Sequence, residues 1–410
     1  MENYLDSLLP ILEDQLSVLQ NDHGNDLLGH LAVDRKLKKQ SPSLNEKTLK
    51  AVELLDTLQK QLTPPLYTLV DNLFGFINSK ALLCVVKFNI PEILHRHGTM
   101  TVDDLANACD PPLAADRLDQ VLRLLISAGL FTYSAATRTY ANNATSELIR
   151  SGHWTRWDLW ANLYPTHFYE MLRYLPDHLQ ASQQRTAAQL HFNTHESLYE
   201  HLAKTDWVEQ FHRTIGAGAT AQAPGMLVDY PWKEIKSQTV CDLGCGGGQF
   251  LFQLLDKYPQ MSGALMDLPT TVEIAKRNFD SGGPFQSCIG QIVAFHGGDF
   301  FDSVPAYAIY SIKWTLHNWP DDKAETILKN VRRSIKIEEQ SRLLIIESVV
   351  ADGRCGRPAH YGDIIMMIGA NGKERERQQW GELAGKTGWR IDKVWMLRNC
   401  LSSVIDLRPV

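Results

Sequence analysis

The second half of the chain alternates between short apolar runs and amphipathic helical patterns. Residues 239–242, 262–267, 292–296, 308–313 and 342–347 are apolar runs of strand length, separated by segments in which apolar residues recur at helical spacing. Two further runs, 390–397 and 401–407, have no helix between them and are predicted to form an antiparallel hairpin. This pattern predicts an α/β domain over residues 233–410, with a Rossmann-like, mostly parallel seven-stranded sheet closed by that hairpin.

The first 62 residues predict a helical arm with a polar joint at residues 21–40. Two narrow apolar stripes with no partner of their own must be buried against another surface. A second subunit or the catalytic domain could cover them, and we favour the second subunit. The stripes consist of Leu5, Leu8, Leu9, Leu12, Leu16 and Leu19, and of Leu49, Val52, Leu55, Leu58 and Leu62.

Residues 63–150 have the order of elements typical of a winged-helix domain. Thr101 is predicted to cap a short helix, and residues 114–130 form a second helix that ends near a glycine. In a DNA-binding protein this second helix would read the major groove, but here it is mostly apolar and carries two arginines against two aspartates. We therefore expect a packing or dimerisation role for the domain. The small wing is predicted from residues 131–133 and 139–141.

Residues 151–232 are predicted to form a helical connector that is unusually rich in aromatic side chains. Two interpretations stay open: a stripe of core residues, or the wall of an apolar substrate pocket, where aromatic residues and a few polar groups are expected. The aromatic residues are Trp154, Trp157, Trp160, Tyr164, Phe168 and Tyr169, with His153 and His167 among them.

Composition narrows the class of protein. An apolar fraction of 44% is ordinary for a globular chain, and a net charge of −6 does not suggest a nucleic-acid surface. The seven cysteines have no metal-binding spacing and are odd in number, which fits the reducing cytoplasm. No apolar run approaches the roughly 18 residues of a membrane span. We expect a cytoplasmic protein without a metal, a nucleic-acid partner or a membrane segment.

The glycine-rich stretch TVCDLGCGGGQF at residues 239–250 is the strongest single motif. It places glycines between a predicted strand and a predicted helix, where ligands approach the backbone of a doubly wound fold. A nicotinamide fingerprint would need glycine at position 249, where Gln249 stands. A G-x-G-x-G pattern at Gly244, Gly246 and Gly248, preceded by Asp242-Leu243, favours S-adenosylmethionine (SAM). A dinucleotide site and a purely structural turn are the alternatives. Asp267 ends the next predicted strand, where an acidic side chain can bind a ribose diol.

Further segments in order resemble the plant and fungal small-molecule O-methyltransferases, the caffeate O-methyltransferase-like family. They are DLGCGGGQF, MDLPTTV, GGDFFDSVP, IKWTLHNWPDD and IIESVV, followed by NGKERERQQW, and they span most of residues 239–380. The resemblance implies a SAM-binding domain behind a winged-helix dimerisation domain, and hence a homodimer. It also implies SAM contacts at Asp242, Gly244, Gly246, Asp267, Leu268, Asp299, Phe300 and Lys313.

The resemblance further implies a general base, His317, supported by Glu347 and Glu374. A phenol has a pKa near 10, so only roughly one molecule in a thousand is ionised at pH 7. A neutral histidine can take its proton during methyl transfer, and a carboxylate on the other ring nitrogen would fix the tautomer. Each of these residues also has a simpler interpretation. His317 could be a histidine at the start of a helix, Glu347 could cap a neighbouring helix, and Glu374 could belong to a solvated charged face. Asn318 stands where this family commonly has aspartate.

The leading hypothesis is a SAM-dependent O-methyltransferase acting on a hydroxylated aromatic or polyketide-like small molecule in secondary metabolism. Some fungal proteins resembling this family are instead pericyclases, which dehydrate or cyclise pyridone-type alkaloids with bound SAM. In those proteins a cation at the position of Lys313 polarises a carbonyl and a second histidine assists, for which His153 is the candidate here. The intact His317 with its two glutamates favours methyl transfer. A non-enzymatic winged-helix regulator is the third alternative.

Overall fold

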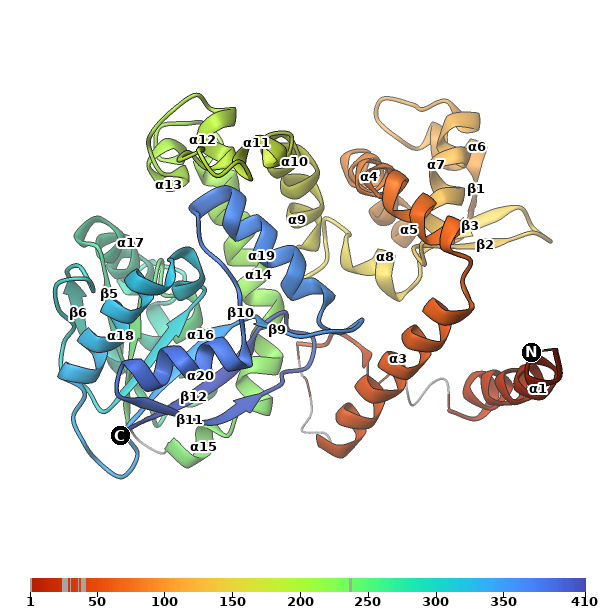
Figure 1. The fold of residues 1–410 in the computed structure, drawn as a ribbon. Helices are drawn as coiled ribbons and strands as arrows, with labels where there is room; N and C mark the ends of the chain where they lie inside the picture. The colour runs from red at the N-terminus through yellow and green to blue at the C-terminus, as the bar shows by residue number, and fades with distance from the viewer. Residues whose placement is uncertain (1, 24–28, 30, 36, 38–41, 236–237) are drawn as a thin grey trace. The chain divides into compact units, whose positions relative to one another are not determined.

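The computed structural model describes residues 2–23, 29, 31–35, 37, 42–235 and 238–410 (Figure 1). The chain divides into two units, residues 1–37 and 38–410. In the first unit, helix α1 (Glu2–Val18) continues into the π-helical turn η1 (Leu19–His23), which confirms the first predicted helix of the arm. Much of the predicted polar joint at residues 21–40 lies outside the described residues.

A seven-stranded sheet organises the C-terminal half of the larger unit, with the strand order β11-β12-β8-β7-β4-β5-β6. The five strands from β8 to β6 are parallel to one another, whereas β12 runs antiparallel to both β8 and β11. The predicted sheet and its closing hairpin are therefore confirmed. Its strands are β4 (Thr239–Leu243), β5 (Ser262–Asp267), β6 (Ile292–Gly297), β7 (Ile309–Lys313), β8 (Arg342–Glu347), β11 (Trp389–Trp395) and β12 (Ser403–Pro409).

Hydrophobic clusters cover both faces of this sheet. Leu344 and Ile346 of β8 belong to one cluster, and the alternate residues Leu343 and Ile345 belong to the other. Strands buried on both faces read as continuous apolar runs, which is why the sequence located them well. The helices of this region are α16 (Gln249–Lys257), α17 (Pro269–Phe279), α18 (Asp321–Ser334), α19 (Arg357–Ala370) and α20 (Arg377–Lys386), with 3-10 turns η3 (Gln286–Gln291) and η4 (Leu316–Asn318).

A second, two-stranded sheet was not predicted. Strand β9 (Val349–Val350) pairs in parallel with β10 (Arg375–Glu376), so that Val349 faces Arg375 across the pair. Two residues are too few for an alternating pattern to be visible in the sequence. The small sheet matters because it joins the chain just after β8 to the chain just after α19.

The winged-helix order predicted for the N-terminal part of the larger unit is confirmed. The wing is a three-stranded sheet of order β1-β3-β2, in which β1 is an addition to the two predicted strands. Thr101 caps α6 as expected, because its hydroxyl oxygen accepts from the Asp104 N–H at 3.3 Å. The elements are α3 (Pro42–Leu62), α4 (Pro65–Lys87), α5 (Ile90–His97), β1 (Met100–Thr101), α6 (Val102–Asn107), α7 (Ala115–Ser127), β2 (Thr132–Ser134), β3 (Thr139–Ala141) and α8 (Ala144–Leu148).

Helix α4 corrects the expectation that no segment approaches the length and apolarity of a membrane span. Within the described parts of the chain it is the one helix that passes that test by length and composition, with a mean hydropathy of 1.5. The sequence hid this property because Asp71, Asn72 and Asn78 interrupt the apolar run. Eight large apolar side chains of its first half are exposed: Leu66, Tyr67, Leu69, Val70, Leu73, Phe74, Phe76 and Ile77.

The connector between the winged helix and the large sheet is helical, as predicted. Its aromatic residues divide between two environments, since Phe168 packs in a core cluster with Met171 and with Ile368 of α19, whereas Trp160 lies close to Trp314 after β7. The elements are α9 (Trp157–Leu163), the π-helical η2 (Tyr164–Phe168), α10 (Tyr169–Leu172), α11 (Leu175–His178), α12 (Ala187–His191), α13 (Leu198–Leu202), α14 (Val208–Asp229) and α15 (Trp232–Ile235).

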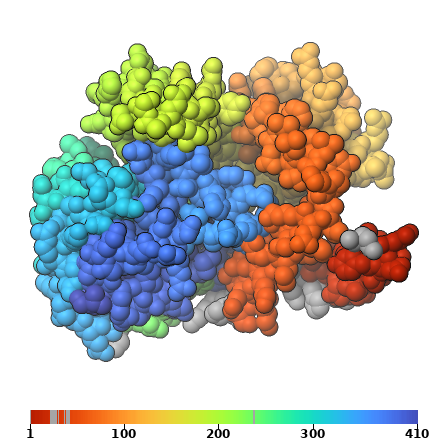
Figure 2. Space-filling view, in the orientation of Figure 1, coloured from red at the N-terminus to blue at the C-terminus, as the bar shows by residue number. Residues whose placement is uncertain are grey.

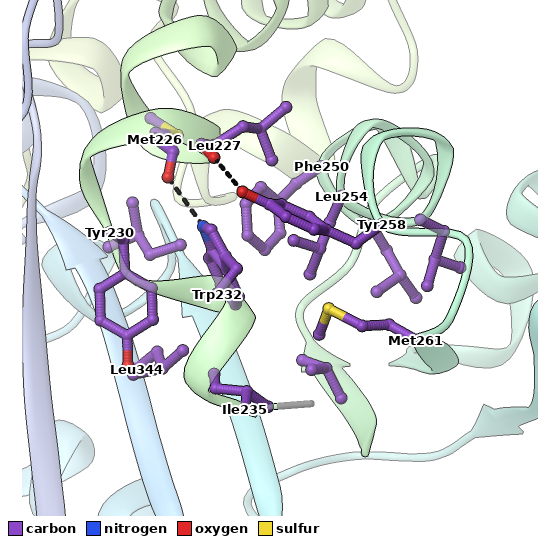
Figure 3. Packing of buried hydrophobic residues seen from close by; sticks show 14 of the residues in the cluster. Met226, Leu227, Tyr230, Trp232, Ile235, Phe250, Leu254, Tyr258, Met261 and Leu344 are labelled. Atoms are coloured by element: carbon purple, nitrogen blue, oxygen red, sulfur yellow. Dashed lines mark hydrogen bonds between the residues drawn. The ribbon is translucent and has the colours of Figure 1, made fainter. Parts of the chain in front are cut away.

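The end of α14 is fixed to the large sheet domain by two aromatic side chains (Figure 3). The indole N–H of Trp232, which is fully buried, donates to the Met226 carbonyl at 2.8 Å. The Tyr258 hydroxyl of the segment after α16 donates to the Leu227 carbonyl at 2.7 Å. The carbonyl groups in the last turn of a helix have no N–H donor within the helix, and these two hydrogen bonds supply donors for two of them. Helix α14 is therefore anchored at its C-terminal end to the sheet domain.

We expect the substitution Trp232→Ala to lower the free energy of unfolding by about 3–5 kcal/mol, the range for truncating a large buried aromatic side chain. It removes both the packing of the indole and its hydrogen bond to Met226. Urea unfolding followed by circular dichroism measures the change. Leu179→Ala, at a side chain that is 67% exposed, is the control and should change stability by no more than about 0.5 kcal/mol. Equal midpoints for the two variants would contradict this account.

Candidate active site

The residues predicted to form the site come together at the carboxyl edge of the parallel strands. Five neighbouring strands, β6, β5, β4, β7 and β8, end at this edge, and the predicted residues lie at those ends or in the loops that follow. Ligands of open α/β sheets bind outside this edge. In the last two positions of their strands lie Asp242 of β4, Asp267 of β5, Lys313 of β7 and Glu347 of β8. In the loops that follow the strands lie Gly244 and Gly246 after β4, Leu268 after β5, Asp299 and Phe300 after β6, and His317 after β7.

The glycine turn after β4 approaches the end of β7. Gly244 has φ +67°, and a Cβ atom built on it would lie 2.7 Å from Oγ1 of Thr315. A side chain at this position would therefore be strained and would also collide with the neighbouring loop. Glycine here keeps the loops after β4 and β7 in contact. The N–H groups of Gly244 and Cys245 both donate to the Met266 carbonyl of β5, at 2.9 and 3.2 Å, so they tie the turn to the neighbouring strand.

The carboxylate of Asp267 joins the glycine turn to the end of β5. Its Oδ2 accepts from the Gly246 N–H at 2.9 Å, and its Oδ1 accepts from the Leu268 N–H at 2.8 Å. Burial raises the pKa of Asp267, although these hydrogen bonds oppose the shift. Each carboxylate oxygen can accept a second hydrogen bond. Leu268 beside it is 52% exposed, so an apolar surface and a charged acceptor lie next to each other here.

The loop after β6 is held by a residue that the sequence analysis missed. The Asn330 side chain of α18 donates to the carbonyls of Phe300 and Phe301 at 2.8 and 2.7 Å. Asp299 closes the same loop by accepting from the Phe301 N–H at 2.8 Å. A buried asparagine in a charged amphipathic helix has no local signature, because only the fold brings it beneath this loop.

Asp242 and Lys313 are opposite charges on the adjacent strands β4 and β7. Asp242 is buried, and its Oδ1 accepts from the Ser311 hydroxyl at 2.7 Å. Burial raises the pKa of Asp242 to about 7, and burial lowers the pKa of Lys313 to about 8 against the attraction of Asp242 and Glu347. The ammonium of Lys313 lies 3.3 Å from the centroid of the Trp314 ring, which is a cation–π contact. Asp242 and Lys313 do not form a short ion pair with each other.

His317, Glu347 and Glu374 form a compact triad. Nδ1 of His317 lies 2.8 Å from Oε1 of Glu374 and 3.1 Å from Oε2 of Glu347. The three side chains are 12%, 0% and 3% exposed in the order His317, Glu347, Glu374. The charged stretch around Glu374 is therefore not simply a solvated face, because this member of it points inward.

Glu347 caps the turn that carries His317, which confirms one of the two interpretations of this residue; its role in a reaction stays a prediction. Its Oε1 accepts from the N–H groups of Thr315 and Leu316 at 2.8 and 3.0 Å, at the start of η4, which contains His317. Its other oxygen faces the imidazole. One carboxylate thus fixes the backbone that carries the histidine and contacts the histidine ring.

The charges of the triad shift the pKa values of its members. Burial by itself lowers the pKa of His317, but Glu347 and Glu374 outweigh it and hold the pKa above its usual value, while Lys313 opposes them. Burial and repulsion by Glu374 raise the pKa of Glu347. Among the described residues, Oε2 of each glutamate is buried and accepts no hydrogen bond, although Oε2 of Glu347 lies 3.1 Å from Nδ1 of His317, and this penalises full ionisation of the pair. Both carboxylates meet Nδ1, so Nε2 is the nitrogen that would meet a reacting group.

The same triad is a plausible donor set for a metal ion by its chemistry. One imidazole nitrogen and two carboxylate oxygens lie within 4.8 Å of one another. Such mixed sets bind zinc or iron in other proteins. The absence of a metal therefore stays a prediction.

Aromatic residues of the connector reach the end of β7. The ring centroids of Trp160 and Trp314 are 6.4 Å apart, and Tyr164 lies 5.1 Å from Trp160. The indole N–H of Trp160 donates to the Thr214 carbonyl of α14 at 2.8 Å, which fixes the ring against α14. The Tyr199 hydroxyl donates to Oδ1 of Asn318 at 2.8 Å. Sequence patterns could not single out Tyr199, because it comes from α13, more than a hundred residues from its partner.

His153 lies elsewhere in the connector, in the turn between α8 and α9. Its Nδ1 is 2.7 Å from the Thr155 hydroxyl, and its ring lies 5.9 Å from that of Trp154. These contacts are local in sequence. The assisting role predicted for His153 in the alternative reaction stays a prediction.

Comparison with known proteins gives matches over the whole chain. An O-methyltransferase domain profile matches residues 188–390, and an O-methyltransferase dimerisation domain profile matches residues 70–151. The O-methyltransferase sirM of Leptosphaeria maculans is 47% identical over 415 residues, with 100% of both chains covered. The O-methyltransferase gliM of Aspergillus fumigatus is 42% identical over 368 residues, covering 90% of this chain and 85% of gliM.

Solved structures share the fold. CalO1, a methyltransferase in calicheamicin biosynthesis solved in an S-adenosylhomocysteine-bound form, superposes with a TM-score of 0.72 at 24% identity, covering 85% of this chain and all of CalO1. Human N-acetylserotonin methyltransferase in complex with SAM gives a TM-score of 0.69 at 21% identity, covering 85% of this chain and 99% of that protein.

We expect Glu374→Gln to lower the pKa of His317, because it removes one of the two negative charges at Nδ1 and keeps the size of the side chain. Carbon-13 NMR of histidine-labelled protein, titrated with and without the substitution, measures the change. Glu376→Gln, at the exposed neighbouring position, is the control. An unchanged pKa of His317 in Glu374→Gln would mean that Glu347 alone sets it.

Proposed function

Because the chain belongs to the O-methyltransferase family, we propose that the His317–Glu347–Glu374 triad is the reaction centre of its SAM-dependent methyl transfer. The observation that carries this proposal is the meeting of both carboxylates at Nδ1 of His317, at distances of 2.8 and 3.1 Å. Such an arrangement keeps a proton on Nδ1 and leaves Nε2 as the base. It also stabilises the imidazolium that forms when Nε2 takes a proton.

The cofactor edge fits SAM by shape and by donor chemistry. At Gly246, which has φ +55°, a Cβ would meet no atom within 4 Å, so the turn leaves space for a ligand at that point. We propose that Asp267 accepts from the ribose hydroxyls and that Leu268, Asp299 and Phe300 flank the adenine. Gly244, Gly246, Asp242 and Lys313 would then surround the methionine part, where Asp242 and Lys313 offer opposite charges for its ammonium and carboxylate groups. When bound, SAM supplies an electrophilic methyl group on a positively charged sulfur.

The chain's own residues then have three tasks. His317 accepts the proton of the acceptor hydroxyl at Nε2 as the oxygen attacks. Glu347 holds the start of η4 through two backbone N–H groups and so places the imidazole relative to the cofactor edge. The loops after β4 and β7 touch at Gly244 and Thr315, which keeps the two reactants aligned.

We propose a hydroxylated aromatic or polyketide-like acceptor from secondary metabolism. Trp160, Tyr164 and Trp314 form a chain of neighbouring rings that leads to the segment containing His317. Aromatic surfaces with few polar groups suit flat, apolar acceptors. The pair Tyr199–Asn318 adds a polar contact beside His317. Relatives with natural-product names include the trimodular acetylaranotin synthesis protein of Aspergillus terreus, which is 31% identical over 403 residues, covering 98% of this chain and 38% of that protein.

The alternative, a SAM-bound pericyclase, would use Lys313 rather than His317. The observation in its favour is that the Lys313 ammonium faces an aromatic ring and has a pKa near 8, so it could donate to a carbonyl. Mass spectrometry of the products separates the two reactions. Methyl transfer adds one methyl mass and forms S-adenosylhomocysteine, whereas a pericyclase gives an isomerised or dehydrated product and leaves SAM unconsumed. The cytoplasmic location also stays a proposal, supported by seven unpaired cysteines.

We propose that the enzyme is a homodimer built on its dimerisation domain at residues 70–151. The exposed apolar half of α4 supports this, because a folded chain rarely leaves eight large apolar side chains of one helix in water. The interface is expected to exceed roughly 2,000 Å² in total, as for other permanent dimers. Light scattering at micromolar concentration should give twice the chain mass of 46.3 kDa, and a monomer under these conditions would refute the proposal.

We expect Asp267→Ala to weaken binding of S-adenosylhomocysteine by about 1–3 kcal/mol, the scale for losing hydrogen bonds to a charged group. The substitution removes the proposed acceptor of the ribose hydroxyls and also releases the Gly246 N–H. Isothermal titration calorimetry measures the affinity. Asp280→Ala, which lies after α17, is the matched control and should bind normally. Unchanged affinity of Asp267→Ala would count against the ribose role.

We expect His317→Ala to reduce turnover roughly a hundredfold or more, the usual scale for a general base, while SAM affinity is retained. In the native enzyme, turnover should rise with pH through the raised pKa of His317, so the acid limb lies above the ordinary histidine value of about 6.5. That limb should disappear in His317→Ala. Steady-state kinetics across pH provides the test. Full activity of His317→Ala, beside an inactive Lys313→Ala that still binds SAM, would favour the pericyclase.

A further inference from the structure

Helix α3 contacts the loop between β9 and α19 through the carboxylate of Glu53. Oε2 of Glu53 accepts from the Arg354 N–H at 2.8 Å, and Oε1 accepts from the Cys355 N–H at 2.6 Å. In the space-filling view, the orange surface of α3 adjoins the blue C-terminal part of the chain (Figure 2). The two partners are about three hundred residues apart in the sequence, so this contact is purely tertiary.

The loop is shaped to receive this carboxylate. Gly353 has φ +90°, and a Cβ atom built on it would lie 2.0 Å from Oε2 of Glu53. Any other residue would be strained and would push the carboxylate away. Two successive backbone N–H groups that point to one spot, just before the start of a helix, form a natural anion site. Here the anion is supplied by the chain itself.

The loop lies between the two carboxylates of the triad. Glu347 ends β8 and is followed within three residues by β9, from which the loop at residues 351–356 continues into α19. Glu374 directly precedes β10, which pairs with β9. The small β9–β10 sheet therefore sets the spacing of the two glutamates, and the Glu53 contact holds the point where the chain leaves that sheet.

Helix α19 carries the constraint onward to Glu374. Asp363 of α19 accepts from the Glu374 N–H through Oδ1 at 2.9 Å. Gly362 lies so close that a Cβ on it would be 3.3 Å from Oε1 of Glu374, the oxygen that contacts His317. The Lys373 N–H next to it donates to the His317 carbonyl at 2.8 Å. A shift of α19 would therefore move the glutamate and the histidine relative to each other.

We propose that Glu53 is a positioning residue for methyl transfer. Its carboxylate fixes the loop at residues 351–356 and the start of α19, and this contact, called the latch below, keeps Glu374 within hydrogen-bonding distance of His317. This inference rests on the proposed role of the triad. It assigns the arm helix α3 a function in the reaction that is separate from subunit association. Hydrogen bonds from Cys355 and Arg354 hold the pKa of Glu53 below its usual range, so the latch stays charged at neutral pH.

The test compares Glu53→Ala and Glu53→Gln with the native full-length protein. Hydrogen–deuterium exchange reports on the loop and the first turn of α19. In Glu53→Ala these amides should exchange at least roughly tenfold faster, because their acceptor is gone. Glu53→Gln keeps one acceptor oxygen and should be intermediate. Glu46→Gln, which removes a charge from an exposed position of the same helix, is the control and should exchange like the native protein.

The second readout is the pKa of His317 by carbon-13 NMR, which loss of a purely structural contact would not move. Glu347 and Glu374 raise this pKa and Lys313 lowers it, so a displaced Glu374 should lower it in Glu53→Ala and less in Glu53→Gln. Calorimetry with S-adenosylhomocysteine should give native affinity and so show that the fold is intact. Native exchange in Glu53→Ala would refute the latch, and faster exchange with an unchanged pKa of His317 would refute the positioning role. Neither readout requires turnover, so failure of the proposed function would be seen separately, as absent methylation by the native enzyme.

Discussion

Two buried carboxylates that share one imidazole nitrogen are the constraint on which much of this structure depends. Burying Glu347 and Glu374 is costly, because each loses its hydration and each repels the other. The cost is offset by the Thr315 and Leu316 N–H groups, which donate to Glu347, and by the imidazole of His317. Glu374 is held in place by its backbone N–H, which donates to Asp363 of α19. Thr315, Leu316 and His317 follow β7, whereas Glu347 ends β8 and Glu374 lies between α19 and β10, so the triad can exist only when all four elements are in place.

The triad and the cofactor edge are mechanically joined. Thr315 contacts the glycine turn at Gly244, and the glycine turn contacts the end of β5 through the Gly246–Asp267 hydrogen bond. The edge of the sheet thus behaves as one connected surface, on which small displacements of one loop are opposed by the next. For a reaction that depends on aligning an oxygen, a methyl carbon and a sulfur, such connected loops are the main contribution that a protein can make.

Helix α19 connects three regions that are distant in the sequence. Its buried Ile368 packs with Phe168 of the connector, its Asp363 holds Glu374, and the loop before it receives Glu53 from α3. Changes in the connector, where the acceptor is proposed to bind, and changes in α3 would both reach the triad through this one helix. This arrangement gives a physical route by which the N-terminal helices can influence a site at the sheet edge.

The sequence by itself determined the elements whose signals are local. Continuous apolar runs marked the inner strands β4, β7 and β8, which are buried on both faces, whereas the outer strand β11 is partly exposed and carries charged residues. The glycine turn was visible because backbone geometry demands glycine there. Parallel topology then placed Asp242, Asp267, Lys313 and His317 at one edge. Tertiary structure alone decided which face of a charged stretch points inward, as for Glu374, and that Glu347 serves as cap and partner at once. Tertiary structure also decided contacts such as Tyr199–Asn318 and Glu53–Arg354. The two partners of each contact are far apart in the sequence, and no local sequence pattern indicates that they meet.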